Sequence, residues 1–202
     1  MSKLYFYYSS MNAGKSTSLL QANHNYIERG METMMLTPAI DNRAGVGVIK
    51  SRIGLSEKAI AVHKEQDLYV KVASYVSNPS EPKSVSAIFV DEAQFLTKEQ
   101  VDQLSDVVDI LRIPVLAYGL RTDAFGELFP GSERLLAIAD KLIEQKAVCK
   151  CGSKATHVVR FDEHGVAVTG GSQVDIGGND KYESYCRKHW KAEMGKLPLK
   201  LS

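Results

Sequence analysis

Short apolar runs alternate with stretches of helical periodicity along the first 140 residues. Buried strands are indicated by the apolar runs at residues 4–8, 33–37, 85–90 and 115–119. Helices are indicated by the apolar spacing or the start signals at residues 16–29, 67–77, 97–111 and 134–139. Because strands and helices alternate, the pattern predicts an α/β fold with a parallel sheet and helices on both faces.

Residues 39–60 lack clean periodicity, and we expect a surface loop beside the carboxyl end of the preceding strand. Asp41 and Arg43 lie in this segment. They fit two interpretations equally well. One is a contact with a ligand, since such loops carry ligands in open α/β sheets, and the other is a solvated turn pair.

The bulk composition is that of an ordinary globular protein. The chain has 202 residues, 44% of them hydrophobic and 24% charged, and a net charge of +1. So small a charge gives no basic surface for nucleic acid or for an anionic membrane. No apolar stretch reaches the roughly 20 residues that span a bilayer. Three cysteines and no export signal favour a reducing compartment, so we expect a cytoplasmic protein without nucleic-acid or membrane partners.

A phosphate-binding loop is indicated directly after the first strand. Gly14, Lys15 and Ser16 end a small-residue segment that runs into a helix. In the pattern G-x-x-x-x-G-K-[ST], backbone N–H groups hold phosphates, the lysine reaches the outer phosphates and the hydroxyl binds Mg²⁺. Ser9 stands where that pattern has its first glycine. The alternative is a chance Gly-Lys-Ser sequence in a loop, but the strand and helix on either side favour a site for ATP.

A pair of acidic residues follows the third strand. Asp91 and Glu92 come directly after the apolar run 85–90. P-loop proteins place a carboxylate at such a strand end to hold Mg²⁺. Asp91 is the predicted metal ligand, and Glu92 would lie within reach of the group that attacks the terminal phosphate. The alternative is a pair of carboxylates that cap a turn, and the upstream Gly-Lys-Ser motif disfavours it.

The last strand of this region leads into a loop with exposed-looking aromatics. Phe125 and Phe129 lie in residues 120–129, beyond the strand end at Gly119. They fit a ligand wall or plain packing equally well on pattern alone. The loop leaves the same edge of the sheet as the two motifs above.

The C-terminal part has a different chemistry. All three cysteines lie there, with one histidine close to the last of them, and the set is Cys149, Cys151, Cys186 and His189. Three thiolates and an imidazole suit a tetrahedral structural Zn²⁺, which would stabilise a unit too small for a core of its own. The alternative is a set of buried reduced cysteines.

Between the two halves of this set, the sequence predicts a hairpin and a glycine-bounded loop. Strands are expected at 156–162 and 166–168, and the loop spans 170–179. A long loop fixed at its root by a metal could close over a ligand and read a base through its backbone. We therefore expect a nucleotide-binding domain at 1–143, a zinc-binding domain with a substrate-covering loop at 144–192, and a tail at 193–202.

Four segments together resemble the small, zinc-containing thymidine kinases, which are related in fold to RecA-like P-loop proteins. The segments are residues 11–17, 90–96, 118–123 and 176–189. Ser9, the Cys-x-Cys pair and the histidine are similar to the bacterial and phage branch. The resemblance implies transfer of the γ-phosphate of ATP to the 5′-hydroxyl of thymidine, and usually of deoxyuridine, in pyrimidine salvage. It also implies a homotetramer that is inhibited by thymidine triphosphate.

The resemblance assigns roles residue by residue. Glu92 is implied as the general base. The implied contacts of ATP and its metal are Ser9, Ser10, Met11, Asn12, Ala13, Gly14, Lys15, Ser16, Asp41, Arg43, Asp91 and Gln94. The implied contacts of the nucleoside are Gln173, Val174, Asp175, Ile176, Gly177 and Tyr182.

One position departs from the family. Its members place a phenylalanine directly after Thr-Asp in the loop beyond Gly119, and that ring packs on thymine. This chain has Ala124 there, followed by Phe125. Either the loop shifts so that Phe125 stacks on the base, which is the assignment we adopt, or thymine binding is weakened.

Two other classes of protein share parts of these patterns. A P-loop ATPase or nucleotide-sensing switch with a zinc module would hydrolyse ATP without any nucleoside. A nucleic-acid-binding zinc protein would need a basic patch interleaved with aromatics, which the sequence lacks. The kinase hypothesis accounts for the predicted closing loop, and the other two do not.

Overall fold

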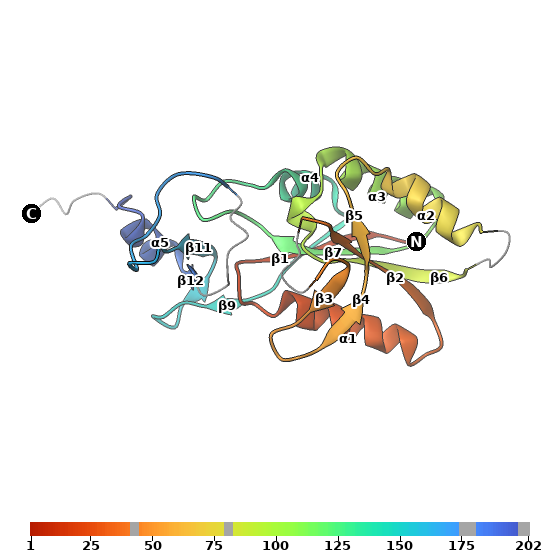
Figure 1. The fold of residues 1–202 in the computed structure, drawn as a ribbon, viewed down its shortest axis with the longest axis horizontal. Coiled ribbons are helices and arrows are strands. Elements are labelled where there is room, and N and C mark those ends of the chain that lie inside the picture. Colours follow the sequence, from red (N-terminus) through yellow and green to blue (C-terminus); the bar gives the residue numbers. More distant parts are fainter. Residues whose placement is uncertain (41–44, 79–82, 174–180, 198–202) are drawn as a thin grey trace, which may run out of the picture.

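A parallel sheet of six strands forms the centre of the larger part of the molecule (Figure 1). The computed structural model describes residues 1–40, 45–78, 83–173 and 181–197. The strand order is β5-β2-β6-β7-β1-β8, and every pairing in this sheet is parallel. The strands are β1 (Leu4–Ser9), β2 (Glu32–Pro38), β5 (Ile60–Val62), β6 (Val85–Val90), β7 (Val115–Leu120) and β8 (Lys141–Glu144). The predicted α/β class is confirmed.

Helices cover both faces of the sheet (Figure 1). One face carries α1 (Lys15–Ile27), and Leu19 and Leu20 of this helix are buried in a cluster with Phe89 and Tyr118. The other face carries α2 (Leu68–Val76), α3 (Lys98–Ile110) and α4 (Pro130–Ile138). Both faces are therefore apolar, which explains why the central strands read as continuous apolar runs.

The starts of two helices follow the sequence signals. Asp67 caps α2, and its side chain accepts a hydrogen bond from the Val70 N–H at 2.9 Å. Thr97 and Gln100 form a reciprocal capping box at the start of α3. The helix α4 begins earlier than predicted, because Pro130 occupies the first turn, where a missing N–H costs nothing.

The prediction of a loop at 39–60 is wrong for its second half. A hairpin of β3 (Val48–Lys50) and β4 (Ser56–Lys58) forms there, and β5 then adds an edge strand to the sheet. The strands are only three residues long, too short for a period to be visible in sequence. Ile49 is the residue that fixes them, since it is 1% exposed and joins the cluster under α1.

The C-terminal part forms a smaller unit beside the sheet (Figure 1). Its elements are β9 (Ala147–Val148), β10 (Lys154–Ala155), β11 (His157–Arg160), β12 (Tyr182–Tyr185) and α5 (Arg187–Glu193). The predicted boundary after residue 143 falls inside β8, one residue before that strand ends. Among the described residues, no helix is long and apolar enough to cross a membrane.

The predicted hairpin forms only near its turn, and the main partner of β11 was not predicted. Residues 166–168 pair with residues 160–162 through one antiparallel bridge and two backbone hydrogen bonds, whereas β11 pairs antiparallel along its whole length with β12. The pairing with β12 buries Tyr185 against Val159 in a common apolar cluster, whereas Val166 is 61% exposed. The burial of apolar surface therefore favours the distant strand over the adjacent one.

Substitution of Gly131 tests how closely α4 packs against residues 93–96. A Cβ there would lie 2.4 Å from the Ala93 carbonyl oxygen and 2.9 Å from that of Leu96, so Gly131→Ala would force backbone apart. Alanine favours a helix over glycine by about 1 kcal/mol, but the clash outweighs this gain. We expect a net loss of about 1–3 kcal/mol in the free energy of unfolding, measured by urea denaturation.

Gly170→Ala is the matched control, because no atom lies within 4 Å of the added Cβ. We expect its free energy of unfolding to stay within about 0.5 kcal/mol of the parent chain. Equal stability of the two variants would contradict the close contact at Gly131.

Candidate active site

A cavity of about 560 Å³ lies beyond the carboxyl ends of β1, β6 and β7. Its walls come from residues 11–17 and 48–53, from Asp91, Glu92, Gln94 and Phe95, from the loop after β7, and from Val158, Gln173 and Tyr182 of the smaller unit. Predicted residues from distant parts of the sequence therefore meet here. The wall formed by the β3–β4 hairpin was missed, because that hairpin was not predicted.

The loop between β1 and α1 has the form of a phosphate cradle. Gly14 precedes the first helical residue and has a φ of 78°, in the left-handed region that glycine adopts without strain. Lys15 is buried, and its Nζ donates to the Ser9 hydroxyl at 3.1 Å and to the Ser10 carbonyl at 3.2 Å. Ser9 therefore positions the lysine side chain across the loop. The sequence showed only that Ser9 replaces a glycine of the motif, and it did not predict this hydrogen bond.

Ser16 and Asp91 join the start of α1 to the end of β6. The Ser16 hydroxyl donates to Asp91 Oδ2 at 2.9 Å, and the backbone N–H of Glu92 donates to Oδ1 at 3.0 Å. Burial, with the neighbouring charge of Glu92, raises the pKa of Asp91 to about 7. A cation beside this carboxylate would lower its pKa again. A hydroxyl and a carboxylate are hard oxygen ligands, so the pair fits Mg²⁺.

Glu92 is held in an unusual conformation at the edge of the cavity. Its φ of 48° and ψ of 38° lie in the left-handed region, which is uncommon for a residue with a side chain. Strain of this kind is found where a function requires a particular side-chain direction. Here it begins the short 3₁₀ helix η1 (Ala93–Phe95) and sets the carboxylate next to Gln94, whose Nε2 donates to Glu92 Oε2.

Gln94 connects Glu92 to the adjacent strand. Its Oε1 accepts from the backbone N–H of Leu120 at 2.9 Å, and its side chain is 1% exposed. Gly119 makes room for this crossing, because a Cβ at that position would lie 2.9 Å from the same Oε1. Gln94 was predicted to border the nucleotide. The structure adds that it orients Glu92, which a sequence motif does not show.

Two aromatic rings form part of the cavity wall. Phe95 and Phe129 both line it and meet edge to face, with ring centroids 5.7 Å apart and planes at 81°. Phe129 had been equally plausible as packing, and Phe95 had not been considered, although it follows Gln94 directly. Tyr182 lines the cavity from the smaller unit, as the resemblance implied.

Phe125 does not line this cavity, although we assigned it to the base. Ala124 does, while the Phe125 ring lies 5.7 Å from the Arg160 guanidinium and packs against the apolar cluster of the smaller unit. Asp123 explains this, because its Oδ1 accepts from the N–H groups of Phe125 and Glu127 at 2.9 Å each and fixes the turn. In this structure the turn therefore directs Phe125 away from the cavity wall.

Asp123 also holds the root of the glycine-bounded loop. Its Oδ2 accepts from Gln173 Nε2 at 3.0 Å, and Gln173 also donates to the Leu128 carbonyl. Asp123 was missed by the sequence analysis, although an aspartate three residues before Gly126 is a turn signal. The other implied contacts Asp41, Arg43, Val174, Asp175, Ile176 and Gly177 lie outside the described residues.

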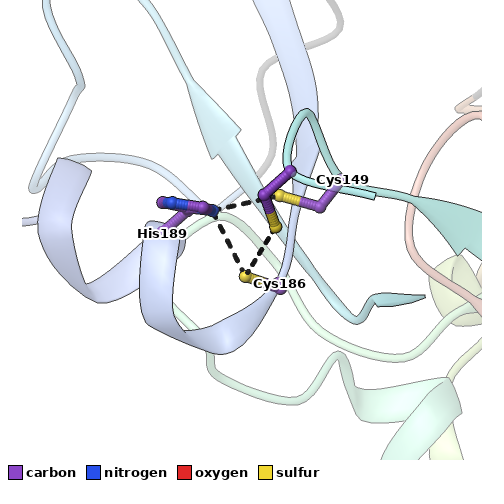
Figure 2. Close-up of side chains that lie close together, drawn as sticks. Cys149, Cys186 and His189 are labelled. Carbon is purple, nitrogen blue, oxygen red and sulfur yellow. Dashed lines mark hydrogen bonds between the residues drawn. The ribbon is translucent and has the colours of Figure 1, made fainter. Parts of the chain in front are cut away.

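The four predicted zinc ligands lie together in the smaller unit, and Figure 2 shows Cys149, Cys186 and His189 of this set. Their ligand atoms are all within 4.8 Å of one another, and His189 Nδ1 is 3.4 Å from the sulfurs of both Cys149 and Cys186. Sulfurs on a tetrahedral Zn²⁺ would be about 3.8 Å apart, and those of Cys151 and Cys186 are 3.9 Å apart. Hydrogen bonds from Ser153 lower the pKa of Cys151 to about 6, which favours the thiolate that binds metal.

Comparison with known proteins agrees with this geometry. The family model described as thymidine kinase matches residues 2–190. The thymidine kinase of Pasteurella multocida is 56% identical over 194 residues, which cover 96% of this chain and 99% of the relative. That of Vibrio cholerae is 57% identical, with coverage of 97% and 100%, and that of Legionella pneumophila is 57% identical, with coverage of 97% and 93%. The chain therefore belongs to the thymidine kinase family and is a nucleoside kinase.

Proposed function

We propose that this enzyme transfers the γ-phosphate of ATP to the 5′-hydroxyl of thymidine, and also of deoxyuridine. The observation that carries the proposal is the convergence on one cavity of a phosphate cradle, a pair of carboxylates and two aromatic rings. A cavity of about 560 Å³ is of the size that holds small ligands. Family membership supports thymidine as the nucleoside.

At the phosphate end, charge neutralisation does most of the chemical work. Phosphoryl transfer passes through a loose transition state, so the protein contributes position and compensating charge. The residues of the loop at 9–16 would hold the phosphates of ATP, and Lys15 would neutralise the outer ones. Mg²⁺ would bind at the Ser16 hydroxyl and the Asp91 carboxylate, where it supplies charge compensation for the phosphates.

Glu92 is our candidate for the general base. Glu92 lines the same cavity as the phosphate loop and the two aromatic rings, and Gln94 orients its carboxylate. A base in this place can orient the 5′-hydroxyl towards the γ-phosphate and accept its proton late in the transfer. Gln94 is then a positioning residue, because it acts through Glu92.

At the nucleoside end, Phe95 and Phe129 are better placed than Phe125 to contact the base. We infer that the pyrimidine packs against one of these rings, with Tyr182 and Gln173 at the rim. The small side chain of Ala124 lies in the same wall. For residues 174–177, Asp41 and Arg43, the assignments as substrate and phosphate contacts rest on the resemblance alone.

Family membership also supports several broader proposals. We infer that the protein assembles as a homotetramer, that thymidine triphosphate inhibits it as the end product, and that residues 144–192 act as a zinc-binding unit whose loop covers the nucleoside. Sedimentation and an inhibition series with thymidine triphosphate test the first two directly.

The defining experiment is Mg²⁺-dependent release of ADP from ATP with thymidine, deoxyuridine, deoxycytidine or no nucleoside. Release that requires thymidine, accepts deoxyuridine and excludes deoxycytidine is the expected result. Release without any nucleoside would instead identify an ATPase. No release with any of the four additions would contradict the proposal.

Substitution of Glu92 by glutamine tests its role. Glu92→Gln keeps the shape of the side chain and removes its basicity, so we expect kcat to fall by at least about 100-fold while the affinity for ATP changes little. Turnover and nucleotide binding are measured separately, by coupled ADP assay and by calorimetry. Glu65→Gln is the control, because Glu65 is exposed and is distant from Glu92 in the sequence. This variant should retain full activity. Near-normal turnover of Glu92→Gln would remove Glu92 from this role.

Metal analysis tests the zinc assignment. We expect about one zinc per chain by elemental analysis of the purified protein. Cys186→Ser should lose this metal and lower the melting temperature, because the small unit would lose a ligand that joins its strands to α5. Ser153→Ala removes a hydrogen bond to Cys151 without removing a ligand, so it should retain the metal. Protein expressed with sufficient zinc and found to contain none would contradict the assignment.

A further inference from the structure

Trp190 is the one tryptophan of the chain, and it links the metal cluster to the nucleoside end of the cavity. It lies on α5 directly after His189, and its ring stacks on His157 with centroids 4.7 Å apart. Its Nε1 donates to the Ala124 carbonyl at 2.9 Å in a buried hydrogen bond. Ala124 in turn lines the cavity. A residue of the metal-binding unit therefore holds the cavity wall directly.

The loop that carries Ala124 contacts the smaller unit at three consecutive residues. Besides Ala124, the Phe125 carbonyl accepts from Lys196 Nζ at 3.2 Å, and the same Nζ lies 4.5 Å from the centre of the Trp190 ring. Gly126 has a φ of 89°, and a Cβ there would lie 3.0 Å from the Trp190 ring. The loop has space for the ring because residue 126 is glycine.

The same unit also contacts the phosphate loop. The Ser184 hydroxyl, on β12, donates to the Met11 carbonyl at 2.6 Å, and Met11 lines the cavity. Ala13 packs against the apolar cluster that contains Trp190. Hydrogen bonds therefore join this unit both to the loop after β7 and to the phosphate loop, and those of Trp190 and Ser184 are among them.

The backbone of Trp190 is placed by the metal cluster. Cys186 is the residue that precedes α5, and its carbonyl accepts from the Trp190 N–H at 2.9 Å. Cys186 and His189 are two of the four cluster residues, so a bound metal fixes the turn of helix that carries Trp190. Without the metal, this short helix would lose the link that the cluster makes to Cys149 and Cys151.

We propose that Trp190 is a positioning residue, through which the metal-bound unit holds the loop at residues 124–126 and so sets the place of Ala124 in the cavity wall. Ser184 performs the corresponding task at the phosphate loop. The kinetic part of this proposal rests on the proposed function, because it uses thymidine as the varied substrate. The spectroscopic part depends only on the single tryptophan.

A matched pair of variants tests the two contacts. Trp190→Phe keeps an aromatic ring against His157 but removes the N–H donor, and Ser184→Ala removes the hydroxyl donor. Loss of one hydrogen bond changes binding by about 5- to 10-fold. We expect Trp190→Phe to raise the KM for thymidine by this factor with the KM for ATP unchanged, and Ser184→Ala to do the reverse. Both variants should retain zinc, and their melting temperatures should be similar to each other.

Gly126→Ala perturbs the same contact from the loop. The added Cβ would press on the Trp190 ring, and alanine would also be strained at a φ of 89°. This variant should therefore displace the loop without altering the metal ligands, and reproduce the thymidine effect with full zinc content. If Trp190→Phe or Ser184→Ala changes both KM values equally, or lowers stability with neither KM changed, the residue is merely structural and the proposal is wrong.

Fluorescence gives a readout that needs no activity. In the parent protein, removal of zinc by a chelator should shift the emission of Trp190 to longer wavelength, because the ring would become exposed to water, and added zinc should reverse the shift. Unchanged emission after verified zinc loss would overturn the proposal. A parent protein that shows this shift but no thymidine-dependent ADP release would contradict the proposed function and leave the metal–tryptophan link supported.

Discussion

The hydrogen bond between Ser16 and Asp91 is the interaction around which the site is arranged. It joins two residues that lie 75 positions apart, and the carboxylate is almost fully buried. A buried charge is costly unless hydrogen bonds or a counter-charge compensate it. The donors at Ser16 and at the Glu92 N–H supply part of that compensation. A divalent metal ion would supply the rest, so the site is electrostatically incomplete in a manner that favours a nucleotide bound together with its metal ion.

The strand order determines which residues can surround this bond. Because β7 lies between β6 and β1, its last residues lie between the strand that leads to Asp91 and the strand that leads to the phosphate loop. Gly119 leaves room there for the Gln94 side chain, and the Leu120 N–H then orients its amide. Glu92 adopts its left-handed conformation at the start of the same turn. Gly119 on β7 therefore leaves room for Gln94 to orient Glu92, which follows the neighbouring strand β6.

The sequence was sufficient to predict those parts of the fold that depend on local pattern. The central strands, the first three helices and the capping box at Thr97 have a period or a cap that can be read within a dozen residues. The metal set at Cys149, Cys151, Cys186 and His189 could be predicted because few other chemistries use those residue types together. Both of these signals can be recognised without knowledge of the tertiary structure.

The failures share a different physical cause. The β3–β4 hairpin and the pairing of β11 with β12 depend on which surface buries more apolar area, and neighbouring sequence does not contain that information. The position of Phe125 depends on hydrogen bonds from two backbone N–H groups to Asp123. Family resemblance suggested that a ring beside a substituted position would replace the missing one, whereas the turn fixes the ring elsewhere.

We expect the stability of the smaller unit to depend both on a bound metal and on its contacts with the larger part of the molecule. Its core consists of few residues, among them Val159, Tyr185 and Trp190, and a core of this size stabilises little by itself. A buried indole N–H needs an acceptor, and Trp190 finds it on the other domain, at Ala124. The contact therefore contributes to the folding of the unit and to the shape of the cavity at once. Thermodynamic linkage makes such coupling reciprocal, so a nucleoside that favours this position of residues 124–126 must also tighten the binding of the metal.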